Sequence, residues 1–154
     1  MVLSSWAFLV RLIAFLPNIV SRTAVFFLYA GISGLSDSRD LEAGVARGDP
    51  KCVLAVEMFC YRVAKYIAAF SVPLGGSCDA LVFTGGIGEK SSLKRAKILG
   101  WIRHLGLTLD PRENEANALD ITGQDSKGAV LVIPTDEELL IARETLDLIM
   151  AGNS

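Results

Sequence analysis

Residues 80–91 read ALVFTGGIGEKS, and this stretch decides the fold class of the chain. Its first residues, 80–84, are apolar or β-prone, which predicts a short buried strand. Three glycines then fall within four positions, at Gly85, Gly86 and Gly88. Backbone without Cβ atoms approaches a phosphate or a flat base closely, and a following helix start offers free N–H groups. The stretch therefore predicts a glycine loop of the kind found in nucleotide sites.

The glycine pattern matches neither of two standard phosphate-binding motifs. The chain has no GxxxxGK[ST] sequence, and Gly86-Ile87-Gly88 is not followed by the third glycine of GxGxxG. Taken alone, the pattern is explained equally well by a tight strand-to-helix turn. The rest of the chain must decide between these two interpretations.

Two helices are predicted before this stretch. Asp37 is the expected N-cap of a helix over residues 39–47, because its carboxylate can accept an orphan backbone N–H. Asp49-Pro50 starts a longer helix that ends near residue 71, with proline at the first helical position. Its apolar residues recur at steps of three and four, which indicates one buried face.

A helix, a strand and a helix are predicted after the stretch. Ser91 or Ser92 caps the first helix, and Gly106 ends it. Its expected apolar face consists of Leu93, Ala96, Leu99, Ile102 and Leu105. Residues 107–128 are polar, with a short strand at 107–109, and residues 129–133 form a second buried strand.

The last predicted helix begins at a capping box and runs to about residue 150. In that box Thr135 caps the first turn and Glu138 reaches back. The order of elements is therefore α-α-β-α-β-α, which predicts an α/β fold. Two or three strands make a thin sheet, so we expect them to be part of a larger one.

Composition excludes a nucleic-acid-binding protein and favours a cytoplasmic one. The net charge is −2 and the pI about 5.4, without a basic cluster. Cys52, Cys60 and Cys78 lack zinc-site spacing and are expected to be reduced thiols. The mean hydropathy is +0.43, with much of the excess in the first thirty residues.

Residues 1–30 are apolar but interrupted by Arg11, Pro17 and Arg22. Because a membrane-spanning helix needs about 20 predominantly apolar residues, this segment is a poor candidate for one. Three alternatives stay open for it: membrane association, a signal peptide, and a buried or partner-facing segment.

Two further pairs of charged residues are candidates for a site. Glu137 and Glu138 would complement a helix dipole, or one of them would hold Mg²⁺ at the carboxyl end of a strand. Asp37 and Arg39 are by themselves an N-cap and a solvated charge. Beside a nucleotide, the guanidinium of Arg39 would contact a phosphate or stack on a base.

Five segments in one order resemble the acetate and propionate kinase family. They read GISGLSDSRDL, FCYRVAKYIAAF, DALVFTGGIGEKSSLKR, HLGLTLDPREN and VLVIPTDEELLIARET. The resemblance covers residues 31–150 and is to the C-terminal part of acetate kinase. It implies three parts: an apolar leader at 1–30 unrelated to the family, the C-terminal nucleotide-binding domain at 31–150, and a tail at 151–154.

The resemblance implies an actin-like, hexokinase-like ATPase fold (also called the ribonuclease H-like or ASKHA fold), in which two α/β domains flank a cleft. The family transfers a phosphoryl group between ATP and acetate, giving ADP and acetyl phosphate, and needs Mg²⁺. The resemblance also implies that the protein forms a homodimer. Glu137 corresponds to the family's Mg²⁺ carboxylate. The nucleotide-binding residues that it implies are Asp37, Ser38, Arg39, Gly85, Gly86, Ile87, Gly88, Glu89 and Lys90.

The chain departs from the family pattern at several points. Lys90 stands where the family usually has Asn, and Asp136 replaces the Asn of Asn-Glu-Glu-Leu. The loop at residues 34–37 is one residue shorter than Gly-Leu-Ser-Ser-Asp. Lys90 would pair with a phosphate or crowd the base pocket, and the shorter loop would shift Arg39.

The family's Asn-Cys-Gly-Ser-Ser-Ser loop, its catalytic Arg, Asp and His residues, and its His-Leu-Gly-Asn-Gly loop have no match here. We therefore expect the N-terminal domain and all catalytic residues to be missing, and the chain alone to be inactive, because several charge-stabilising groups are lost. The first interpretation is a truncated acetate kinase that retains the nucleotide half-site. The alternative is a non-catalytic module that binds nucleotide or pairs with a subunit, with or without membrane association.

Overall fold

The computed structural model describes residues 29–135, 145–146 and 148–150. Most of the predicted last helix, Glu137 and the capping partner Glu138 lie outside these residues, as does nearly all of the apolar segment 1–30. Within the described part, no helix has both the length and the apolar character needed to cross a membrane.

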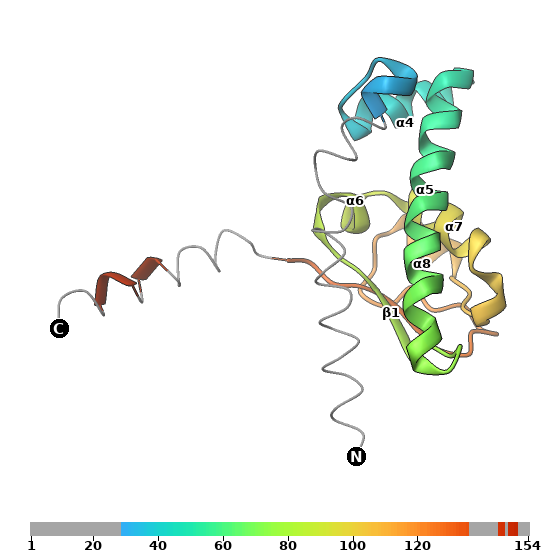
Figure 1. The fold of residues 1–154 in the computed structure, drawn as a ribbon, viewed down its shortest axis with the longest axis vertical. Coiled ribbons are helices and arrows are strands. Elements are labelled where there is room, and N and C mark those ends of the chain that lie inside the picture. The colour runs from blue at the N-terminus through green and yellow to red at the C-terminus, as the bar shows by residue number, and fades with distance from the viewer. Residues whose placement is uncertain (1–28, 136–144, 147, 151–154) are drawn as a thin grey trace.

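The two predicted N-terminal helices are confirmed with their caps. Helix α4 covers Ser38–Ala46, and the Asp37 carboxylate accepts the N–H of Arg39. Helix α5 covers Pro50–Ser71, and the Asp49 carboxylate accepts the N–H groups of Lys51 and Cys52. Helix α5 is the longest element and packs against α4 near its start (Figure 1).

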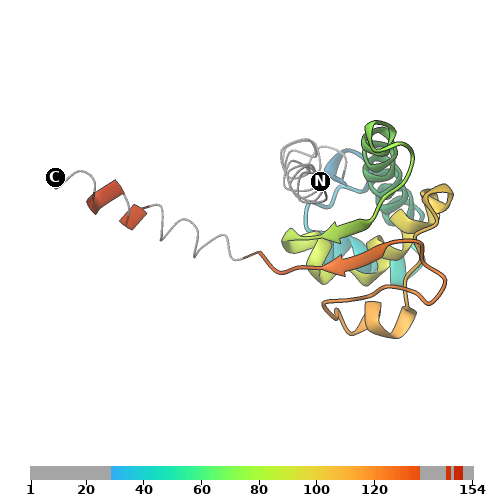
Figure 2. The ribbon, with the colours of Figure 1, turned by 90° about the horizontal axis from the view of Figure 1, so that it is seen from below.

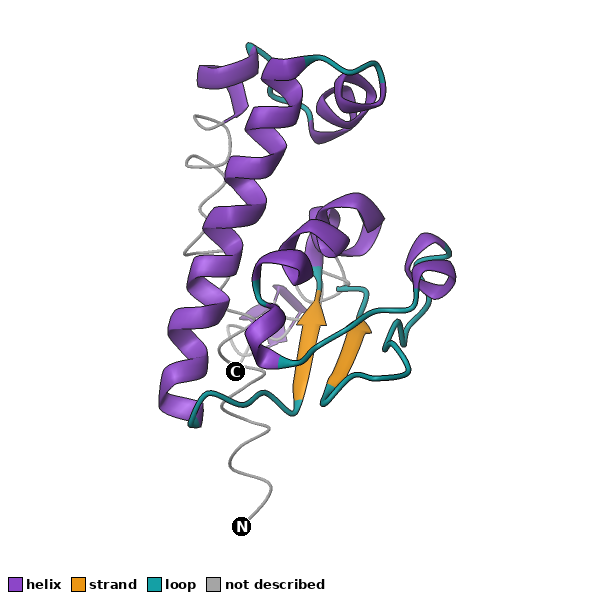
Figure 3. Ribbon diagram, turned by 90° about the vertical axis from the view of Figure 1, so that its right-hand side faces the viewer, coloured by secondary structure: helices purple, strands orange, loops and turns teal. Residues whose placement is uncertain are grey.

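Strands β1 (Ala80–Phe83) and β2 (Ala129–Val132) form a parallel pair, in register from Ala80 opposite Ala129 to Phe83 opposite Val132. They lie side by side and point in the same direction (Figures 2 and 3). Because the pair is parallel, both carboxyl ends meet at one edge of the sheet. Among the described residues the sheet has two strands, as expected.

The crossover between the strands differs from the prediction at four points. Residues Gly85–Lys90 form a short helix, α6, instead of a loop. Helix α7 covers Ser92–Trp101 and ends before the predicted Gly106; a 3-10 turn, η2 (Arg103–Leu105), follows it. The polar region contains a further short helix, α8 (Pro111–Glu115). The short strand expected at 107–109 is reduced to a bridge between Leu109 and Thr122.

The core lies between the buried face of α5, the sheet and α7. The predicted apolar face of α5 consists of Val56, Phe59, Val63, Ile67 and Phe70. The first four are buried as predicted, whereas Phe70 is only half-buried. The predicted face of α7 is partly wrong, since Ala96 is exposed. Its buried residues are Lys94, Arg95, Ile98 and Leu99.

Candidate functional site

Helix α6 begins directly after β1, at the edge where both strands end. Thr84 is its N-cap residue with extended backbone (φ −149°, ψ 168°), but its side chain makes no capping hydrogen bond. Gly85 follows with φ +72°, a left-handed conformation that favours glycine. The sharp change from strand to helix thus depends on Gly85.

The other two glycines of α6, Gly86 and Gly88, differ in their surroundings. A Cβ atom at Gly88 would lie 3.3 Å from the backbone carbon of Phe83, so this glycine permits close packing on β1. A Cβ atom at Gly86 would meet nothing within 4 Å. Gly86 is exposed and has no positive φ. Its missing side chain therefore has no packing or backbone reason within the described structure.

The carboxylate of Glu89 points back to the start of α6. Its Oε1 accepts hydrogen bonds from the N–H of Gly85 at 2.8 Å, the N–H of Thr135 at 2.9 Å and the hydroxyl of Thr135 at 3.0 Å. Burial acts to raise the pKa of Glu89, but these hydrogen bonds and the charge of Lys90 outweigh it and hold the pKa below its usual range. The carboxylate thus joins the residues that follow β1 to those that follow β2.

Arg95 holds the other end of α6. Its guanidinium is fully buried, and Nη1 donates to the carbonyl oxygens of Gly88 at 2.8 Å and Glu89 at 2.9 Å. The remaining N–H groups donate to Asn114 Oδ1 and O and to Asn117 Oδ1, each at 2.7 Å. Burial lowers the pKa of Arg95, and the charge of Glu42 opposes this shift. A cation at carbonyl groups also complements the negative end of a helix dipole.

The predicted residues on α4 form a second part of the site. Arg39 is 91% exposed and donates through Nε at 3.2 Å and Nη2 at 2.8 Å to the Asp37 carboxylate. The hydrogen bond from the Arg39 side chain, with that from its backbone, lowers the pKa of Asp37 to about 2. The Asp37 carboxylate is therefore ionised at neutral pH, and the exposed guanidinium lies at the start of α4.

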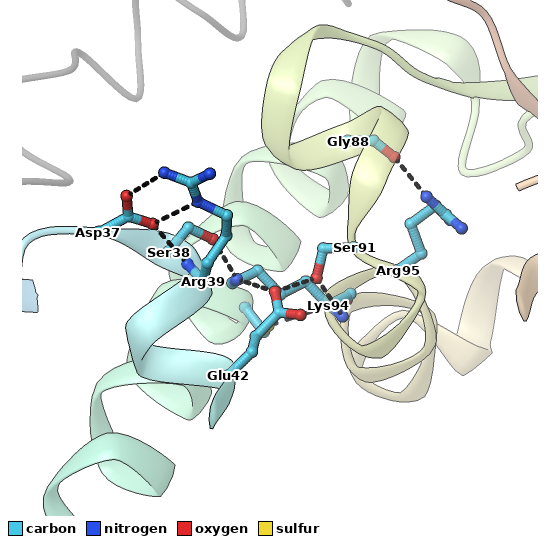
Figure 4. Close-up of polar contacts among 9 residues, drawn as sticks. Asp37, Ser38, Arg39, Glu42, Gly88, Ser91, Lys94 and Arg95 are labelled. Carbon is cyan, nitrogen blue, oxygen red and sulfur yellow. Dashed lines mark hydrogen bonds and ion pairs between the residues drawn. The ribbon is translucent and has the colours of Figure 1, made fainter. Parts of the chain in front are cut away.

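Lys94 connects α4 to α7. Its buried ammonium donates to Ser38 Oγ at 2.7 Å and forms an ion pair with Glu42 (Figure 4). The hydroxyl of Ser91 donates to the same Glu42 carboxylate at 2.6 Å. Ser38 therefore bonds within the protein, and this network fixes the start of α4 against the start of α7.

Two adjacent residues, Lys94 and Arg95, connect the two predicted parts of the site. The first segment is residues 37–39 and the second is residues 85–90. Lys94 binds Ser38 of the first segment, and Arg95 binds Gly88 of the second (Figure 4). Ile87 packs on the core, whereas Lys90 is exposed at the end of α6. Glu137 lies outside the described residues.

Sequence reasoning missed Lys94 and Arg95 as organising residues, although a signal existed. Ile98 and Leu99 come four residues after Lys94 and Arg95, so all four lie on one helical face. The predicted face follows the apolar residues alone, whereas a buried cation needs partners that its own helix does not supply. The partners are Glu42 and Asn114, which lie far away in the sequence.

No group of three or more His, Cys, Asp or Glu side chains within the described ranges could hold a metal ion. Mg²⁺ usually keeps several waters and binds through one or two carboxylates plus substrate phosphates. A single protein carboxylate would therefore be enough to hold Mg²⁺. Glu137 lies outside the described residues, and its role as that carboxylate stays a prediction.

A parallel strand pair whose first strand leads directly into a glycine-containing helix defines an α/β protein. The sequence profile of the Acetokinase family matches residues 27–143, and the chain belongs to that family. The acetate kinase of Carboxydothermus hydrogenoformans is 48% identical over 122 residues, covering 78% of this chain and 30% of the relative. The acetate kinase of Bacteroides fragilis is 46% identical over 120 residues, covering 77% and 30%.

Solved structures show the same relationship. The propionate kinase of Francisella tularensis matches with a TM-score of 0.70 and 34% identity, covering 85% of this chain and 36% of that protein. The acetate kinase of Porphyromonas gingivalis matches with a TM-score of 0.67 and 36% identity, covering 79% and 31%. The chain thus has the α/β fold of part of these kinases and spans about 30% of the length of the curated relatives that it matches.

Proposed function

We propose that this chain supplies the adenine-nucleotide half of an acetate kinase site, as the C-terminal domain of the ASKHA fold. In the complete reaction ATP and acetate give ADP and acetyl phosphate. Such transfer depends mainly on positioning and charge stabilisation. The chain's part is to bind the nucleotide along α6 and to place the Arg39 guanidinium near its phosphates.

Gly86 is the observation that carries the proposal. Gly85 and Gly88 have structural reasons to be glycine, whereas a Cβ at Gly86 would meet only open space. Glycine lowers helix stability by roughly 0.5–1 kcal/mol relative to alanine. Gly86 differs from the equally open Gly100 on α7 in its place, because it lies in α6 directly after β1, where both strands end. An open glycine at that place fits a surface against which a flat ligand lies.

The bound nucleotide would be the Mg²⁺ complex, with Glu137 as the protein's carboxylate ligand, directly or through water. When bound, Mg²⁺ supplies charge neutralisation between the phosphates. The acyl-acceptor site and the catalytic residues would belong to the part of the relatives that this chain does not match. Acetate or propionate is therefore a substrate only together with that part. We also propose a homodimer, in a cytoplasmic protein.

The alternative function is that of a module that binds nucleotide or pairs with a longer kinase subunit without catalysis. Kinase activity distinguishes the two functions. Nucleotide binding is common to both, so it is the property to test first.

The test is calorimetric titration of ADP with Mg²⁺ into the wild-type chain, Gly86→Ala and Gly100→Ala. Gly100 is the matched control, because it is also an exposed helical glycine with nothing within 4 Å of an added Cβ. Gly86→Ala should keep the fold and weaken binding about tenfold, roughly the effect of one misplaced contact. Gly100→Ala should bind like the wild type. Equal affinities in both variants would contradict the proposed nucleotide surface.

A further inference from the structure

The Glu89 carboxylate links two segments that lie far apart in the sequence. Gly85 and Thr135 both donate to its Oε1, although Thr135 is 46 residues away from Glu89. Gly85 comes two residues after the end of β1, and Thr135 three residues after the end of β2. One oxygen atom thus spans the carboxyl ends of both strands.

This contact is strengthened by the charge of the carboxylate. An ionised carboxylate only accepts hydrogen bonds, and Gly85 N, Thr135 N and Thr135 Oγ all donate. Bonds to an ionised acceptor are shorter and about twice as strong as neutral ones. The side chain of Glu89 is therefore directed toward the protein.

The backbone of Glu89 is fixed independently of its side chain. Arg95 Nη1 binds the carbonyl oxygens of Gly88 and Glu89, and Arg95 is in turn held by Asn114 and Asn117. The C-terminal end of α6 is therefore held to α7 by Arg95, whatever the Glu89 side chain does. The tie from Glu89 to Thr135 is the additional contact through which α6 fixes the chain after β2.

We propose that Glu89 is a positioning residue, which holds Thr135, and with it the described residues 133–135 after β2, at a set place relative to α6. This inference rests on the proposed function, in which α6 carries the nucleotide and Glu137, two residues after Thr135, is the Mg²⁺ carboxylate. Glu89 then acts on the metal-dependent part of binding and does not touch the nucleotide. This role differs from the direct contact that the resemblance implied.

The test compares the wild-type chain with Glu89→Gln, using Glu113→Gln on α8 as an exposed control. The first readout is amide hydrogen exchange at Thr135, resolved by NMR. Loss of a charge-assisted bond should raise its exchange rate about tenfold in Glu89→Gln, and not in Glu113→Gln. Unchanged exchange at Thr135 would overturn the proposal.

The second readout separates positioning from direct contact. ADP affinity is measured with Mg²⁺ and with EDTA, and the ratio of the two is compared between variants. Glu89→Gln should reduce the gain from Mg²⁺ about fivefold or more and leave the metal-free affinity within about twofold, since only the segment after β2 shifts. An equal fall with and without metal would overturn the positioning role. If the wild type binds no nucleotide, the proposed function fails, while the exchange at Thr135 still decides whether the tie exists.

A pH series keeps the proposal testable if Glu89→Gln does not fold. Protonation removes the acceptor charge, so the protection of the Thr135 amide in the wild type should fall as the pH drops below the ordinary glutamate pKa of 4.5. Protection that is constant through this range, in a chain that stays folded by circular dichroism, would overturn the tie.

Discussion

The buried ammonium of Lys94 lies 2.7 Å from the hydroxyl of Ser38, on a different helix. Lys94 also pairs with Glu42, which accepts a hydrogen bond from Ser91. A buried cation is tolerated only where such partners compensate its lost hydration. The relative placement of α4 and α7, and with it the place of Arg39 at the start of α4, therefore depends on this network.

Removing the partner of Lys94 should be strongly destabilising. Glu42→Gln leaves a buried ammonium without its counter-ion and should lower the free energy of unfolding by about 3 kcal/mol. Glu57→Gln is the matched control, because the Lys97–Glu57 pair is partly exposed and should contribute at most about 1 kcal/mol. Urea unfolding of the three proteins measures both values, and similar losses in the two variants would count against the burial argument.

Replacing Arg95 by lysine should also destabilise the chain. A lysine ammonium cannot reproduce the fork that reaches Asn114, Asn117 and two carbonyl groups of α6. Arg95→Lys should cost about 2–4 kcal/mol, because several buried acceptors lose their donors. Arg103→Lys, at an exposed position of η2, should cost less than about 0.5 kcal/mol. Denaturant unfolding checks both, and a neutral Arg95→Lys would refute the anchor role.

The free thiols should differ in reactivity. Cys52 and Cys60 are buried, whereas Cys78 is half-buried, and burial raises the pKa of Cys60 to about 12. Because the thiolate is the reactive species, iodoacetamide should modify Cys78 first. Peptide mass spectrometry after timed labelling gives the order, with Cys78→Ser as the control that stays unlabelled until it is denatured. Labelling of Cys60 as fast as Cys78 would contradict the packing of α5.

Acid should weaken the start of α4 in a defined pH range. The hydrogen bonds from Arg39 lower the pKa of Asp37 from 3.8 to about 2. Since the folded chain then binds fewer protons than the unfolded chain, this stabilisation is complete above pH 3.8 and is lost as the pH falls toward 2. Asp37→Asn keeps a capping side chain and should remove this part of the pH dependence.

Arg39→Gln should reduce that pH dependence without abolishing it, because it removes the guanidinium but leaves the backbone hydrogen bond that also lowers the Asp37 pKa. Unfolding measured at several pH values on the wild type and both variants decides the matter. An unchanged pH profile in Arg39→Gln would show that the pair does not form in solution.

The regular helices and the strands were predictable because their signals are local. Asp37 and Asp49 cap α4 and α5 as the sequence indicated. The same Asp-Pro signal occurs at Asp110 and Pro111, where it starts α8. Local chemistry was therefore sufficient for more of the fold than we predicted.

The candidate site was harder to predict because distant contacts shape it. Glycine is a poor helix former, so a segment with three glycines, Gly85–Lys90, is expected to be a loop. Arg95 binds the carbonyl oxygens of Gly88 and Glu89 and is itself held by Asn114, which is 19 residues away. Glu89 accepts hydrogen bonds from Thr135, which is 46 residues away. Only the three-dimensional structure shows that Gly86, and not Gly88, faces open space.

The most direct test of the nucleotide half-site is an amide hydrogen-exchange footprint of the chain with and without ADP and Mg²⁺. We predict that bound nucleotide slows amide exchange in α6 (residues 85–90) and at the start of α4 (residues 37–39). The exchange rates of the amides in α8 should not change. Absence of protection at saturating nucleotide, or protection confined to other elements, would contradict a nucleotide site on this chain.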